Sequence, residues 1–167
     1  MLACVDVDYR NDGSAFAACV LFDAWVADRP ADERIVRIDE VEAYEPGEFF
    51  RRELPCVLRV LAEVGVELDA VVVDGYVTLD AEGRPGLGAR LYESLKGATP
   101  VIGVAKSRFA SATQAIPLLR GGSKVPLWIT AIGIDPAVAA AHVRDMHGSH
   151  RIPTLLRRVD RAAREAH

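Results

Sequence analysis

Two acidic residues occupy positions where the sequence pattern otherwise predicts apolar side chains, and a third stands at the exit of a buried strand. Asp6 lies in an expected strand at residues 2–9, on the face of that strand that begins apolar. Glu53 lies on the apolar stripe of an expected amphipathic helix. Asp74 follows three valines in the string AVVVDGY, residues 70–76, and stands at the exit of an expected buried strand. A carboxylate on an apolar face costs free energy unless it has a partner, so Asp6 is expected to have one and Glu53 raises the same question. Asp74 is a candidate ligand because sites in α/β sheets form just outside the carboxyl ends of strands.

The three carboxylates are expected to face the same end of the sheet, where sites in α/β proteins form. Such an oxygen-rich set suits Mg²⁺ or Mn²⁺. These ions can activate a water molecule and stabilise the leaving oxygen in phosphodiester hydrolysis. Plainer explanations exist: Asp74 can simply begin a turn, and Glu53 can stabilise a helix N-terminus if a helix restarts at Pro55.

A lysine and a histidine are further candidates for the same chemistry. Lys106 directly follows the short apolar strand expected at residues 100–105, where its ammonium group could balance phosphate charge. His150 precedes the last expected helix and could orient water or a ligand. A lone lysine after a strand is more often simply solvated, and an isolated histidine is usually an ordinary surface or core residue, so both alternatives stay open.

Other cofactor classes are not favoured by the sequence. Cys4, Cys19 and Cys56 are an odd number, widely spaced and without a CxxC pair, which argues against a zinc site or a disulfide framework. They fit reduced, buried thiols in a cytoplasmic protein. The glycine-rich loop at residues 75–88 lacks the spacing of a dinucleotide or P-loop motif, so nucleotide-cofactor binding is not expected.

The composition indicates one globular domain over residues 1–167, half of whose side chains are hydrophobic. A net charge of -4 gives no global attraction to nucleic acid, but six arginines against two aspartates lie between Arg144 and Arg164. This basic stretch could meet a polyanion or form the solvated face of a helix. No segment approaches the ~20 apolar residues that span a bilayer, and no targeting signal is recognised. The oligomeric state is left open.

The order of expected elements predicts an α/β fold. Expected strands, the first three antiparallel and the later ones parallel, lie at 2–9, 14–26, 34–44, 70–74, 100–105 and 126–134. One helix is expected after Pro46 and a second over the string GARLYESLKG at 88–97. A third is expected to begin at Asp135, and a fourth to run from Pro153 to Arg164. Residues 110–124 are not assigned. Three antiparallel strands followed by alternating helices and strands is the order of the ribonuclease H-like architecture, a mixed sheet flanked by helices.

Several strings resemble, in chain order, the motifs of the endonuclease V family of DNA and RNA repair nucleases. VDVDYR resembles its first-strand motif, with Asp6 at the place of its first metal-binding aspartate. YEPGEFFRRE resembles the motif that carries the wedge tyrosine, here Tyr44, and the catalytic glutamate, here Glu53. The DG pair at Asp74 and Gly75 resembles the motif of the second catalytic aspartate.

Two later strings continue the resemblance. GVAKS places Lys106 on the family's lysine, and HRIP places His150 on its late histidine. The resemblance implies a ribonuclease H-like fold, catalysis by Asp6, Glu53, Asp74, Lys106 and His150, and metal binding by the three acids. Tyr44, Gly75 and Arg151 are expected to contact the nucleic acid.

The implied reaction is Mg²⁺- or Mn²⁺-dependent cleavage of the second phosphodiester on the 3′ side of deoxyinosine or inosine, with the base flipped into a pocket. The sequence also departs from the family. The family usually has a segment before its first strand, and Val77 and Asp80 stand where it has a glycine and a histidine. Two alternatives therefore remain: a non-catalytic nucleic-acid-binding module, and a related metal nuclease with a different substrate.

Overall fold

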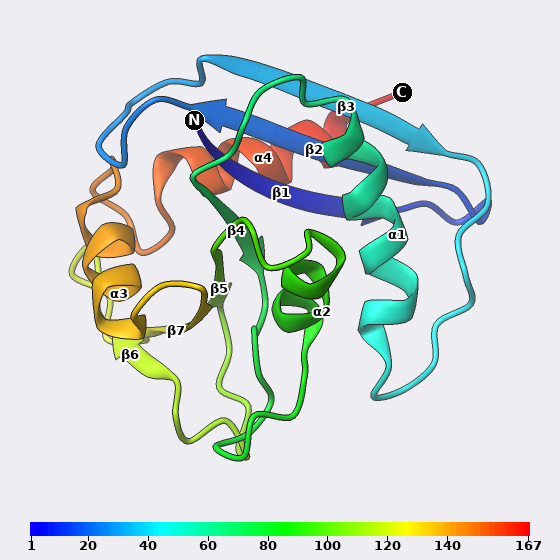
Figure 1. Ribbon diagram of the computed structural model, residues 1–167. Coiled ribbons are helices and arrows are strands. Elements are labelled where there is room, and N and C mark those ends of the chain that lie inside the picture. The colour runs from blue at the N-terminus through cyan, green and yellow to red at the C-terminus, as the bar shows by residue number, and fades with distance from the viewer.

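The computed structural model describes residues 1–167 as one mixed β-sheet with helices on both faces (Figure 1). The strands are β1 (Leu2–Tyr9), β2 (Ala15–Phe22), β3 (Asp32–Ile38), β4 (Ala70–Asp74), β5 (Val101–Ala105), β6 (Ile116–Leu118) and β7 (Leu127–Ile132). The helices are α1 (Phe49–Ala62), α2 (Leu87–Ser94), α3 (Pro136–Asp145) and α4 (Thr154–Glu165).

The strand order across the sheet is β3-β2-β1-β4-β5-β7-β6. The three N-terminal strands are antiparallel, and β4 and β5 lie parallel to β1, as expected. The expectation of parallel pairing is wrong for the last strand, because β7 runs antiparallel to β5. A parallel pair needs a crossover connection that is usually helical, whereas only loops and the short β6 join β5 to β7. The unassigned segment 110–124 contains β6, which pairs with β7.

Some element boundaries also differ from expectation. The second and third strands end at Phe22 and Ile38, earlier than the apolar content of the sequence suggests. Helix α1 is continuous through Pro55, so no helix restarts there and Glu53 lies inside a regular helix. Pro55 has no N–H group, so the carbonyl group of Arg51 lacks its helical hydrogen-bond partner. Both residues are exposed, so this carbonyl can face water and the proline is tolerated.

The two faces of the sheet carry separate hydrophobic cores. One core joins β1, β2, β4, β5 and β7 to α3 and α4 and includes Cys4, Val72 and Val104. The other packs α1 and α2 against the opposite face and includes Val5 and Val73. The alternation along β1 therefore places Asp6 on the same face as Cys4, which is the face that α4 covers.

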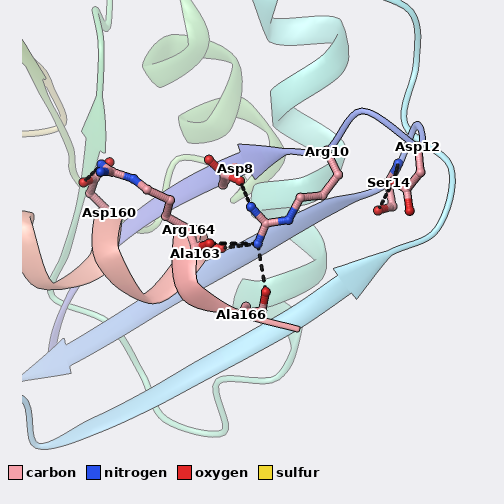
Figure 2. Close-up of polar contacts among 8 residues, drawn as sticks. All are labelled: Asp8, Arg10, Asp12, Ser14, Asp160, Ala163, Arg164 and Ala166. Carbon is pink, nitrogen blue, oxygen red and sulfur yellow. Dashed lines mark hydrogen bonds and ion pairs between the residues drawn. The ribbon is translucent and has the colours of Figure 1, made fainter.

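An arginine holds the end of α4 to the sheet (Figure 2). The Nη2 atom of Arg10, just after β1, lies 3.2, 3.0 and 2.9 Å from the carbonyl oxygens of Ala163, Arg164 and Ala166. Its Nη1 atom pairs with Asp8. These are the carbonyl groups that a helix C-terminus leaves without partners, and a cation also suits the negative end of the helix dipole. Arg10 therefore fixes α4 over β1.

The remaining expectations concern helix caps, thiols and membranes. The side chain of Asp135 accepts hydrogen bonds from the backbone N–H groups of Ala137 and Val138, which confirms it as the N-cap of α3. The three cysteines are free and buried. None of the helices has the length and apolar content needed to cross a bilayer.

We expect that R10A lowers the free energy of unfolding by about 1.5–3 kcal/mol, the range for hydrogen bonds to a charged group. Urea denaturation followed by circular dichroism measures the change. The control is R29A, because Arg29 has 86% of its side chain exposed and pairs only with the neighbouring Asp28. Equal stability of R10A and R29A would show that the contact with α4 contributes nothing.

Candidate active site

The parallel register of the central strands places two carboxylates side by side. Val5 on β1 lies opposite Val73 on β4, so Asp6 and Asp74, the next residues, lie at the same level on the face covered by α4. Asp74 in turn lies opposite Val104 on β5. The sequence alone predicted that these acids share one end of the sheet, and the register makes them neighbours.

Lys106 joins the two aspartates at the end of β5. Its Nζ atom donates a hydrogen bond of 2.8 Å to Oδ2 of Asp74. Asp6, Asp74 and Lys106 line one small cavity, whose apolar lining comes from valines of β1, β4 and β5 and, on α4 and just before it, from Ile152, Leu156 and Val159. Burial opposes the charge of Lys106, but the hydrogen bond and negative charge of Asp74 outweigh it, so the pKa of Lys106 lies above its ordinary value.

Glu53 approaches from α1, on the other side of the sheet. Burial, then the negative charges of Asp6 and Asp74, raise the pKa of Glu53 from 4.5 to about 8. Burial, and then Asp74, raise the pKa of Asp6 from 3.8 to about 7. Asp6 and Asp74 therefore lie close enough to oppose the negative charge of Glu53, and Asp74 lies close enough to oppose that of Asp6.

Arg52 is the nearest compensating charge on α1. Its guanidinium lies 3.6 Å from the ring centroid of Tyr9, at the end of β1, in a cation–π contact. Its positive charge lowers the pKa of Glu53, although less than burial and the two aspartates raise it. The Nε atom of Arg52 is buried without a hydrogen-bond partner. The aromatic ring therefore holds this arginine beside the glutamate.

The site has the chemistry of a divalent cation site, although its carboxylates are not gathered into a closed cage. No group of three acidic, histidine or cysteine side chains is packed tightly enough to hold a metal ion in the present arrangement. Carboxylate oxygens are the donors that Mg²⁺ and Mn²⁺ prefer. The raised pKa values of Asp6 and Glu53 mark negative charge that a cation would offset. The donor types therefore fit the ion, and the side chains would have to move together to hold it.

Asp160 on α4 is a further acid that the sequence analysis did not identify. Its negative charge contributes to raising the pKa values of both Asp6 and Lys106, so it belongs to the same group of charges. It forms an ion pair with Arg164, one turn later on α4 (Figure 2). The spacing of Asp160 could have identified it from the sequence. Asp160 comes four residues after Leu156, so it lies on the same side of an amphipathic helix as this apolar residue, which lines the cavity.

The other predicted residues form no hydrogen bond or ion pair with the carboxylates. The side chain of His150 is exposed and makes no hydrogen bond to any of the acids, while its carbonyl oxygen accepts from Arg120. Tyr44 is 49% exposed in the loop before α1, and its ring meets that of Phe49 edge-on at 5.1 Å. Arg151 donates all its hydrogen bonds to backbone carbonyl oxygens.

The loop after Asp74 is folded back on itself. Gly75 has a φ of +127°, which a residue with a side chain rarely adopts, so glycine is needed directly after the acid. Val77 is fully buried, and its N–H donates to Thr130 Oγ1 at 2.8 Å. A Cβ atom on Gly88 would lie 2.6 Å from the side chain of Val77. The absence of a side chain at Gly88 therefore allows α2 to lie close to this loop. Asp80 accepts from the N–H of Arg84.

Sequence comparison identifies the family. The family model for Endonuclease V matches residues 1–152. The chain belongs to the Endonuclease V family. The Endonuclease V of Azotobacter vinelandii is 38% identical over 128 residues, which cover 76% of this chain and 56% of that protein. The Endonuclease V of Xanthomonas campestris is 36% identical over 111 residues, which cover 66% of this chain and 45% of that protein. This chain thus spans about half the length of its curated relatives.

Solved structures of the family have the same fold. Endonuclease V from Streptomyces avermitilis is 30% identical with a TM-score of 0.79, over 98% of this chain and 79% of that chain. Ciona intestinalis Endonuclease V, solved in complex with a 24mer DNA containing an inosine followed by a ribo-adenosine, is 17% identical with a TM-score of 0.83, over 98% and 84% of the two chains. These similarities confirm the expected ribonuclease H-like fold.

The raised pKa values predict how stability depends on pH in the metal-free protein. Between pH 4.5 and 8 the unfolded chain releases the Glu53 proton while the folded chain keeps it, and Asp6 behaves similarly between 3.8 and 7. The unfolded state then binds fewer protons, so the free energy of unfolding falls as pH rises through these windows. Urea denaturation in EDTA measures this slope.

The control variant is E53Q, which should show a shallower fall because it removes the larger of the two windows. A hydrogen bond from the side chain of Ser14 lowers the pKa of Asp12, and one from Arg34 lowers that of Asp32. These two acids make the free energy of unfolding rise with pH, but only below pH 3.8. A wild-type slope equal to that of E53Q would contradict the burial of Glu53 among the other acids.

Proposed function

We propose that this protein is a Mg²⁺- or Mn²⁺-dependent endonuclease that cleaves a phosphodiester 3′ to deoxyinosine or inosine in nucleic acid and acts in DNA repair. The observation that carries the proposal is the convergence of Asp6, Glu53 and Asp74 from three separate elements, with Lys106 bonded to Asp74. Membership of the Endonuclease V family supports it. So does the inosine-containing DNA bound by the Ciona intestinalis enzyme.

The proposed roles follow from where the side chains lie. Asp6, Glu53 and Asp74 would hold the cation, and Asp160 lies close enough to contribute through its charge. A bound cation would supply Lewis-acid stabilisation of phosphate charge and a more acidic water molecule. The ammonium group of Lys106 would bind the phosphate that reaches Asp74. His150 is exposed, at the start of the segment that leads into α4. Its proposed auxiliary role requires its side chain to turn towards the substrate.

The nucleic acid would lie across the ends of β4 and β5 and the adjoining part of β1, where Asp6 and Asp74 are. The exposed rings of Tyr44 and Phe49 lie at the N-terminus of α1 and could separate or stack on bases, as the resemblance implies for Tyr44. Because Gly75 has no side chain, the phosphate backbone of the nucleic acid would be able to approach Asp74 closely. The three reduced, buried cysteines favour a reducing compartment, so we propose a cytoplasmic location.

A non-catalytic nucleic-acid-binding module is the second candidate. It is favoured by the loop after Gly75, in which Val77 is buried and Asp80 bonds to the backbone of Arg84, so neither side chain is available to a substrate base. The same loop would also suit a metal nuclease with another substrate. These candidates differ from the first in their response to Mn²⁺ and to the damaged base.

We expect wild-type protein with Mn²⁺ to nick end-labelled strands that contain deoxyinosine or inosine and to leave matched adenosine strands intact. D6N and D74N should each reduce the rate by about 100-fold or more, the scale of losing one catalytic group. The control is D28N, because Asp28 is exposed and pairs only with its neighbour Arg29. Gel electrophoresis of the products measures the rates, and EDTA should abolish cleavage.

The outcomes separate the candidates. Binding of the oligonucleotide without cleavage, together with no heat of Mn²⁺ binding in calorimetry, would establish the binding module instead. Cleavage that ignores inosine would establish a nuclease with another substrate. Equal activity of D6N, D74N and wild type would refute the assignment of both acids.

We expect Y44A to lower cleavage of duplex substrates more than cleavage of single strands. Only the duplex requires bases to be unstacked, which costs a few kcal/mol that an inserted ring helps to offset. Y44F should behave as wild type, because it keeps the ring and its edge-on contact with Phe49. The ratio of duplex to single-strand rates is the measurement, and an unchanged ratio in Y44A would exclude Tyr44 as a wedge.

A further inference from the structure

The backbone around Lys106 is held by two side chains from distant parts of the sequence. Nη2 of Arg151, in the segment between α3 and α4, donates to the carbonyl oxygen of Lys106. The hydroxyl of Tyr76, in the loop after β4, donates to the next carbonyl oxygen, that of Ser107, at 2.7 Å. Two consecutive carbonyl groups thus have partners from two different loops. The segment that carries the ammonium group is therefore held at two points.

Arg151 also spans the point where β5 and β7 separate. Its Nε atom donates to the carbonyl oxygen of Val125, and Nη2 donates to that of Pro126, both at 2.9 Å. Lys106 directly follows β5, whereas Val125 and Pro126 directly precede β7. The planar guanidinium therefore joins the end of one strand to the start of its neighbour. These N–H groups are committed to the protein. The contacts therefore favour a positioning role over the phosphate contact expected from the sequence.

Tyr76 holds the segment from the opposite loop. Its hydroxyl accepts a hydrogen bond of 2.9 Å from the N–H of Phe109 while it donates to Ser107, so a single oxygen fixes the turn that follows Lys106. The rings of Tyr76 and Phe109 pack at 6.0 Å between centroids. Tyr76 is itself placed by Gly75, whose N–H donates to the carbonyl oxygen of Val104 on β5 at 3.1 Å.

We propose that Tyr76 and Arg151 are positioning residues that hold Lys106 with its ammonium group on Asp74. A lysine side chain loses considerable conformational entropy when it is fixed, and a backbone held on both sides reduces the freedom still to be lost. The inference deepens the proposed function, because the ammonium group is the proposed phosphate ligand. The hydrogen bonds themselves do not depend on any reaction.

Acetylation of lysines tests the proposal without requiring activity. The chain has three lysines, and Lys96 and Lys124 are exposed internal references for Lys106. In EDTA, acetic anhydride labelling followed by mass spectrometry should show Lys106 protected by its pairing with Asp74. D74N gives the rate for the unpaired ammonium group. Y76F and R151Q should raise the Lys106 rate several-fold towards that of D74N, with the two reference lysines unchanged.

The matched control for the hydroxyl is Y92F, in a half-buried tyrosine of α2 that packs beside Gly97 and Gly133, and it should label as wild type. Thermal unfolding checks that each variant is folded. Y76F removes one oxygen and keeps the ring, so it remains informative if R151Q does not fold. Wild-type protection of Lys106 in folded Y76F would overturn the proposal, whether or not the protein is a nuclease.

Salt dependence separates the positioning role of Arg151 from phosphate binding. In EDTA, R151Q should bind a single-stranded deoxyinosine oligonucleotide with the wild-type slope of log affinity against log salt. A slope reduced by about 1 would show a phosphate contact and overturn the assignment. Arg157, which is exposed and forms no ion pair, provides the comparison variant R157Q.

Kinetics give a further readout if the wild type is active. With Mn²⁺, Y76F and R151Q should lower kcat and leave KM nearly unchanged. R151K should resemble R151Q, because one ammonium group cannot reach three carbonyl oxygens. Recovery of the wild-type kcat in R151K would show that only the charge matters and would overturn the positioning role.

Discussion

The burial of carboxylates beside one another is the constraint on which this end of the structure depends. The parallel pairing of β1 with β4 puts Asp6 and Asp74 at one level, and α1 brings Glu53 within reach of both. Burial and proximity raise the pKa values of Asp6 and Glu53, which means that the folded chain holds these charges at a cost in free energy. The positive charges of Lys106 and Arg52 offset part of that cost. A fold that maintains such an arrangement is suited to a divalent cation.

Elements from both faces of the sheet are needed to maintain this arrangement. Glu53 belongs to the layer of α1 and α2, whereas Asp160 belongs to α4 on the opposite side. The continuous course of α1 through Pro55 keeps Glu53 on a rigid helix. The contacts of Arg10 with the C-terminus of α4 keep Asp160 beside β1. Rigid elements on two layers can hold acids together more accurately than loops can.

The loops around the acids show a different kind of order. The segments after β4 and β5 are joined by side-chain bonds to backbone groups, among them Tyr76 to Ser107 and Gln114 to Thr78. The burial of Val77 makes the first of these loops part of the core. The loop after β4 is therefore fixed by packing and by side-chain bonds, so it is an ordered part of the structure around the acids.

The sequence by itself determined the local elements and the candidate acids. Alternation predicted β1, continuous apolar runs predicted β4 and β5, and helical spacing or capping residues predicted the helices. Carboxylates on apolar faces pointed to Asp6 and Glu53. These signals lie within a few neighbouring residues. Motif resemblance identified the family.

Only the tertiary structure decided the direction of β7, the existence of β6, the place of Asp160 and the commitment of Arg151 to backbone carbonyls. Each of these depends on contacts between residues far apart in the chain. The pattern around Arg151 is that of any exposed arginine, because its partners at Lys106, Val125 and Pro126 become neighbours only when the strands pair.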